Sequence, residues 1–138
     1  MQSSVSTAIG KKRMWAGRIL SALPVLMLVF SAVLKFMKPA SVVEGFARYG
    51  YPEDLIRILG ILELLSSVIY VIPRTSVLGA ILMTGYLGGA IATNVRVGDP
   101  SFFIPVLLGV LVWGGLYLRD GRLSALIPVD LGASRSTL

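Results

Sequence analysis

Apolar residues dominate four long stretches of the chain, and short polar segments separate them. The stretches cover residues 15–37, 55–72, 76–95 and 102–118. A helix needs about 20 mainly apolar residues to cross the hydrocarbon core of a bilayer. The third stretch holds no charged residue, and Arg18 and Lys35 flank the uncharged centre of the first, where their long side chains can reach the interfaces. The pattern predicts an all-α integral membrane protein built as a bundle of four transmembrane helices.

The longest predicted connection, residues 38–54, has a helical pattern of its own. Glu44 and Arg48 are spaced to pair on one helix face, and Gly50 and Pro52 follow as helix-ending residues. Apolar side chains recur at helical spacing: Val42, Val43, Phe46 and Tyr49. We therefore predict a short amphipathic helix lying at the membrane interface between the first and second spans. An irregular loop is the alternative.

Two tails flank the membrane domain, which we place at residues 15–122. Residues 1–14 are largely polar and end in three consecutive basic residues before Met14, so we predict a disordered basic tail. A signal peptide formed with the first apolar stretch is the alternative, although that stretch is long for one. Residues 123–138 form the predicted C-terminal tail.

Composition supports a membrane protein and gives its orientation. Hydrophobic residues make up 55% of the chain and charged residues 14%, where soluble domains have roughly a quarter charged residues. Of the 13 Lys and Arg residues, eight fall on the side of the termini and five on the other. The positive-inside rule therefore predicts both termini in the cytoplasm. The basic residues flank apolar runs, so lipid is the expected partner and nucleic acid is not. Arg18, Arg74 and Arg119 are interpreted as ordinary snorkelling side chains.

The chain contains neither Cys nor His, which excludes much chemistry. Thiol relays and the usual haem, zinc and copper ligands are missing. No G-x-G-x-x-G motif follows a predicted strand, so no flavin or nucleotide site is expected. We predict no metal site and assign no catalytic residue.

Glu63 is the most informative residue because it lies inside the second apolar stretch. A carboxylate at membrane depth costs ~2.5 to 3.5 kcal/mol even on permissive scales, and such residues usually face the bundle interior and mark a site. Chain direction alternates between spans, so polar residues of different spans gather at one level. We predict that Glu63 pairs with Lys35 first and Arg96 second. The candidate ligand pocket comprises Lys35, Glu63, Thr93, Asn94 and Arg96, with Tyr49 and Tyr86 at its edge. A purely structural ion pair is the alternative.

The third stretch is rich in small residues, including the G-x-x-x-G pair Gly85 and Gly89. Small residues let helix backbones approach closely in lipid. We predict that these glycines pack helices together, within the bundle or in a homo-oligomer.

Several segments resemble the DoxX-like family of small four-span bacterial membrane proteins. They are G-R-I-L-S-A at 17–22, V-L-K-F at 33–36, G-x-P-x-x-L-x-x-x-L-G-I-L-E-L at 50–64 and L-G-A-I-L-M-T-G-Y-L-G-G-A-I-A-T-N-V-R-V-G-D-P at 78–100. The resemblance implies the four-span fold and a bacterial inner membrane location. Many relatives carry histidine where this chain has Asn94, so a histidine relay or metal site is not carried over.

The family includes subunits of a quinol oxidase and thiosulfate:quinone oxidoreductase system, which implies a quinone and a redox partner protein. One interpretation is therefore a redox-associated subunit that binds a quinone or similar hydrophobic molecule near Glu63. The other is a non-enzymatic lipid or small-molecule binder, a transporter, or an assembly factor for membrane proteins.

Overall fold

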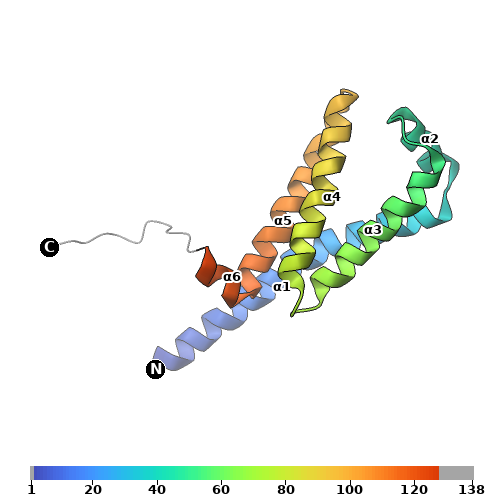
Figure 1. Ribbon diagram of the computed structural model, residues 1–138. Helices are drawn as coiled ribbons and strands as arrows, with labels where there is room; N and C mark the ends of the chain where they lie inside the picture. The colour runs from blue at the N-terminus through green and yellow to red at the C-terminus, as the bar shows by residue number, and fades with distance from the viewer. Residues whose placement is uncertain (1, 128–138) are drawn as a thin grey trace.

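The computed structural model describes residues 2–127, and every element in that part of the chain is helical (Figure 1). The prediction of an all-α fold is confirmed. The elements are α1 (Gln2–Met37), α2 (Ala40–Arg48), α3 (Glu53–Val71), α4 (Ser76–Arg96), the 3-10 helix η1 (Pro100–Phe102), α5 (Phe103–Arg119) and α6 (Gly121–Leu126).

Three described segments are long and apolar enough to cross a membrane: Gly10–Met37, Ser76–Arg96 and Pro100–Arg119. The prediction of four such helices is therefore wrong by one. Helix α3 is the one that fails, because its 19 residues include Glu53, Asp54, Arg57 and Glu63. The apolar stretch was recognised correctly, but the helix that contains it carries more charged residues than the segments Ser76–Arg96 and Pro100–Arg119.

The first helix is longer than predicted. Helix α1 begins at Gln2, so residues 2–14 continue the first span and do not form a disordered tail. This stretch contains no proline, and Arg13 ties it to the rest of the bundle. The Arg13 guanidinium donates to the Tyr117 carbonyl at 3.3 Å and to the Ser124 hydroxyl at 2.8 Å.

The predicted C-terminal tail is also partly helical. Helix α6 begins after Asp120, whose side chain accepts a hydrogen bond from the Arg122 amide at 2.9 Å, as an N-cap residue does. Leu123 is buried in the core cluster, so this short helix packs onto the bundle. Residues 128–138 of the predicted tail lie outside the described residues.

The bundle has two distinct ends. Arg122 donates to the Pro73 carbonyl at 3.1 Å, which brings the α3–α4 turn beside α6, and Arg13 of α1 in turn binds Ser124 of α6. We name this the basic end, because it holds a cluster of basic residues: Lys11, Lys12, Arg13, Arg74, Arg119 and Arg122. Helix α2 and η1 lie at the opposite end, which we name the α2 end (Figure 1). Helix α3 thus returns the chain from the α2 end to the basic end.

The long helices pack against the long helices next to them in the chain, and α1 and α5 form one additional, long-range pair. Helix α1 packs against α3 and α5, and α4 packs against α3 and α5. From the turn at Pro73, α3 and α4 diverge toward the α2 end (Figure 1). The core cluster therefore gathers nearer the basic end; its buried members are Leu28, Tyr70, Ala80, Met83, Leu87, Leu108, Val112, Leu116 and Leu123.

Glycines bring the helices together, but most of them are not the glycines that the sequence predicted for this role. A Cβ on Gly79 would lie 2.3 Å from the Tyr70 backbone, and one on Gly17 would lie 2.8 Å from the Gly115 carbonyl. By contrast, a Cβ on Gly85, Gly88 or Gly89 would meet nothing within 4 Å, so these glycines do not pack helices within the described bundle. They lie on the exposed face of α4, and the homo-oligomer expected through that face stays a prediction.

The amphipathic helix between the first two apolar stretches is confirmed as α2. It begins after Pro39 and ends at Arg48, and Gly50 follows with a φ of 80°, a left-handed conformation that glycine adopts without strain. None of its residues is fully buried.

Candidate functional site

Lys35 and Glu63 form a buried ion pair between α1 and α3. The ammonium nitrogen lies 2.7 Å from Glu63 Oε2, and the two side chains are 9% and 2% exposed. Gly60 permits the approach, because a Cβ at that position would lie 3.1 Å from the Lys35 Cβ. Glu63 therefore has Lys35 as its partner, the first of the two basic residues predicted.

Two further side chains complete the polar group around this pair. The Lys35 ammonium donates to the Ser31 hydroxyl, one helical turn away, at 2.5 Å. It also lies 5.8 Å from the centre of the Tyr86 ring, and the Tyr86 hydroxyl interacts with the Glu63 carboxylate. Among the described residues, no buried side-chain nitrogen or oxygen lacks a hydrogen bond. Helices α1, α3 and α4 thus each contribute to one satisfied polar group, which we name the Lys35–Glu63–Tyr86 site.

A second polar cluster fastens the segment after α2 to the end of α4. The Thr93 hydroxyl donates to the Gly89 carbonyl at 2.8 Å. Tyr51 must therefore be the donor in the 2.6 Å contact between its hydroxyl and that of Thr93. This contact bridges α4 and the start of α3 at the α2 end, where the two helices have diverged.

Tyr49 extends this cluster to the loop after α4. Its hydroxyl donates to Asp99 Oδ2 at 3.1 Å, and its carbonyl accepts a hydrogen bond from the Arg96 guanidinium. Hydrogen bonds from Ser101 and then Tyr49 lower the pKa of Asp99 below its ordinary value. Burial, followed by the hydrogen bond to Asp99, raises the pKa of Tyr49. Asp99 is thus held as a charged carboxylate at the α2 end.

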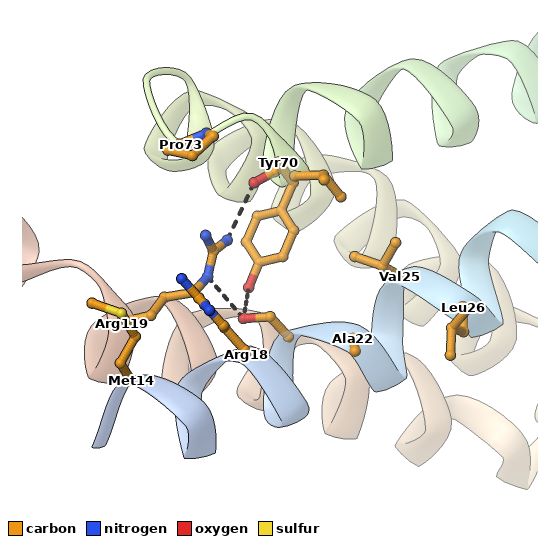
Figure 2. A pocket seen from close by; sticks show the side chains of 10 residues that line it. Met14, Arg18, Ala22, Val25, Leu26, Tyr70, Pro73 and Arg119 are labelled. Atoms are coloured by element: carbon orange, nitrogen blue, oxygen red, sulfur yellow. Dashed lines mark hydrogen bonds between the residues drawn. The ribbon is translucent and has the colours of Figure 1, made fainter. Parts of the chain in front are cut away.

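A pocket of about 510 Å³ lies near the basic end, away from Glu63. Figure 2 shows Arg119 within it, beside Tyr70. The Arg119 guanidinium donates to the Ser21 hydroxyl at 3.0 Å and to the Tyr70 carbonyl at 3.2 Å, and its carbon lies 4.8 Å from the Tyr70 ring centre. The Tyr70 hydroxyl donates to the Val112 carbonyl at 2.7 Å and lies 2.9 Å from the Ser21 hydroxyl. Arg119 therefore joins α5 to α1 and α3 within the bundle. It is not the ordinary snorkelling side chain we expected.

Comparison with known protein families gives a match over most of the membrane domain. A model of the DoxX-like family matches residues 19–115, which run from within α1 to within α5. The chain belongs to the DoxX-like family. No curated protein and no solved structure matches it. The matched segment of this DoxX-like membrane protein contains Lys35, Glu63, Tyr86 and the cluster around Asp99, but ends before Arg119.

The seven predicted site residues of this DoxX-like protein separate into two groups. Lys35, Glu63 and Tyr86 form the first, and Tyr49, Thr93 and Arg96 belong to the second. Asn94 contributes its backbone carbonyl, which accepts from the Asp99 amide at 2.9 Å. No side-chain hydrogen bond of Asn94 is seen within the described residues. Whether these residues bind a ligand stays a prediction.

Ser31, Tyr51 and Asp99 also belong to these groups, although they are not among the seven predicted site residues. Ser31 precedes Lys35 by four residues, so helical spacing alone places it on the same face. Tyr51 carried no comparable signal, because its contact with Thr93 joins residues 42 positions apart.

Proposed function

We propose that this DoxX-like protein is a redox-associated membrane subunit that binds the head group of a quinone, or a similar hydrophobic molecule, at the Lys35–Glu63–Tyr86 site. The observation that carries the proposal is the buried Lys35–Glu63 ion pair with the Tyr86 phenol beside it. Buried ion pairs add little net stability, and well-packed apolar residues often replace them without loss. An intramembrane carboxylate is therefore better explained by a function than by a contribution to folding.

The three side chains suit the chemistry of a quinone head group. A quinone presents two carbonyl oxygens, for which the Lys35 ammonium and the Tyr86 hydroxyl are hydrogen-bond donors. A quinol presents two hydroxyls, for which the Glu63 carboxylate is an acceptor. The site therefore offers partners to both redox forms of the ligand.

In the direction of quinol oxidation, two electrons and two protons leave the ring. Glu63 accepts one proton as a general base, and the second passes to water at the α2 end. The chain has no Cys or His, and no cluster of metal-ligating residues occurs among the described residues. We therefore assign the two electrons to a partner redox protein.

We further propose that the protein lies in a bacterial inner membrane with its basic end in the cytoplasm. Support comes from the clustering of basic residues at one end of the bundle, as the positive-inside rule requires. In the cysteine-free chain, a cysteine at exposed Leu126 should be protected from an impermeant thiol reagent in intact cells. A cysteine at exposed Asp54, near the α2 end, should react. The reverse labelling pattern would invert the orientation.

The quinone proposal is tested by extracting the purified protein with solvent and quantifying quinone by mass spectrometry. We expect quinone with the wild type and its loss from a Lys35→Met/Glu63→Leu double variant, which removes both charges together. The matched control is Lys38→Met/Glu53→Leu, because that pair is 3.6 Å apart and its side chains are 24% and 61% exposed. The control should retain quinone. Equal amounts in all three proteins, or none in any, would favour the non-enzymatic interpretation.

A further inference from the structure

The pocket near the basic end combines apolar walls with two arginines. Helices α1 and α5 and the end of α3 enclose it; its lining residues are Met14, Arg18, Ser21, Ala22, Val25, Leu26, Tyr70, Val71, Pro73 and Arg119. Arg18 and Arg119 both line the pocket; Figure 2 shows their side chains on one side of the view and Val25 and Leu26 on the other. One end of the pocket is thus cationic and the other is aliphatic.

Neither arginine has a carboxylate partner among the described residues. The ion pairs there join Lys35 to Glu63, Lys38 to Glu53 and Arg122 to Asp120. The donors of Arg119 bind neutral oxygens of Ser21, Ser76 and Tyr70, which hold its guanidinium in place without offsetting its charge. Arg18 stacks over the Trp15 ring, its guanidinium carbon 5.4 Å from the ring centre. Two positive charges therefore face one pocket, and an anion is the complementary ligand.

The aliphatic end indicates what kind of anion this is. Leu26 and Val71 line the pocket and are 66% and 56% exposed, so the pocket opens onto the apolar surface of the bundle. A free phosphate would leave this end unfilled, whereas an acyl chain would cover it. Because the basic end gathers six Lys and Arg residues, it also attracts anionic lipid from the adjoining leaflet.

We propose that the pocket is a binding site for an anionic phospholipid, with the phosphate between Arg18 and Arg119 and one acyl chain along Val25, Leu26 and Val71. Guanidinium groups bind phosphate oxygens in a bidentate manner, and basic pockets between membrane helices bind anionic head groups. Hydrogen bonds to Ser21 and Tyr70 orient Arg119 before the lipid arrives. This site is separate from the Lys35–Glu63–Tyr86 site and does not depend on the function proposed for it.

Native mass spectrometry of the full chain in detergent tests the proposal, with phosphatidylglycerol and phosphatidylcholine added at equal concentration. We expect a phosphatidylglycerol adduct in clear excess over phosphatidylcholine. Arg18→Gln should lower that occupancy about fivefold, the effect of losing one basic side chain near an anionic surface. Arg18 makes no hydrogen bond among the described residues, so this variant should fold normally. Arg74→Gln removes an exposed charge at the same end and outside the pocket lining, and should have little effect.

A second variant fills the pocket without changing charge. Ala22 lines the pocket, and Ala22→Phe should lower phosphatidylglycerol occupancy as Arg18→Gln does. Equal binding of the two lipids, equal losses in Arg18→Gln and Arg74→Gln, or unchanged binding in Ala22→Phe would overturn the proposal. A further measurement replaces the lipid with inorganic phosphate. We expect no stable phosphate adduct in the absence of lipid. A phosphate adduct lost in Arg18→Gln would assign the site to a free anion.

Discussion

Breaking the Lys35–Glu63 pair from one side should be far more costly than replacing both partners. Lys35→Met leaves the Glu63 carboxylate 2% exposed and without its cation. At 2.7 Å, the Coulomb attraction between the two charges is about 6 kcal/mol if the effective dielectric constant is about 20. Desolvation costs several kcal/mol per ion, which offsets most of this gain. The net stabilisation by the pair is therefore small, although each partner depends strongly on the other.

The expected values follow from that asymmetry. Lys35→Met should lower the free energy of unfolding by about 3 to 5 kcal/mol, as observed when one partner of a buried pair is removed. Adding Glu63→Leu should recover most of the loss, because an apolar pair of similar volume needs no charge compensation. The measurement is reversible unfolding in mixed micelles, followed by the helical circular dichroism signal, for the wild type, both single variants and the double variant.

The control cycle uses Lys38 and Glu53, which are 3.6 Å apart and partly exposed. Exposed pairs contribute about 0 to 1 kcal/mol, so all four proteins of that cycle should unfold within about 1 kcal/mol of one another. If the losses of the Lys35 and Glu63 single variants simply add in the double variant, the two side chains are not coupled. That result would refute the mutual dependence of the two buried charges.

Two further predictions concern packing and pH. Gly79→Ala should destabilise the protein by about 1 to 3 kcal/mol, since the new Cβ would lie 2.3 Å from the Tyr70 backbone; Gly85→Ala, with nothing within 4 Å, should be neutral or stabilise the helix by up to about 1 kcal/mol in the same unfolding assay. Because hydrogen bonds from Ser101 lower the pKa of Asp99 below 3.8, its carboxylate stabilises the fold above that pH, and this contribution is lost as the pH falls through the lowered pKa. The melting temperatures of the wild type and Asp99→Asn should therefore converge at acidic pH, and a constant difference would contradict the assignment.

Local pattern was sufficient to place most of the helices. The predicted stretch 76–95 became α4, Ser76–Arg96, and the connection 38–54 contained α2. Proline, glycine and the spacing of apolar residues act on neighbours only a few positions away. The local sequence therefore determines where these helices begin and end. The Glu63–Lys35 pairing was also predictable, because alternating chain direction places both residues at one depth and an unpaired carboxylate there is costly. Residues 2–14 were misjudged because Arg13 binds partners more than 100 positions away.

Lateral packing was decided only by the tertiary structure. Most faces of the long helices are apolar, and in lipid an apolar side chain gains little by turning inward, so the sequence has no strong signal for which apolar face meets which. The close contacts accordingly fall on Gly17, Gly79 and Gly115, while the G-x-x-x-G pair Gly85 and Gly89 faces outward. Tertiary packing likewise placed Arg119 beside Ser21 and Tyr70, which are 98 and 49 positions away in the sequence. No local pattern specifies contacts of that range, and the pocket they adjoin arises from the crossing of α1 and α5 beside the end of α3.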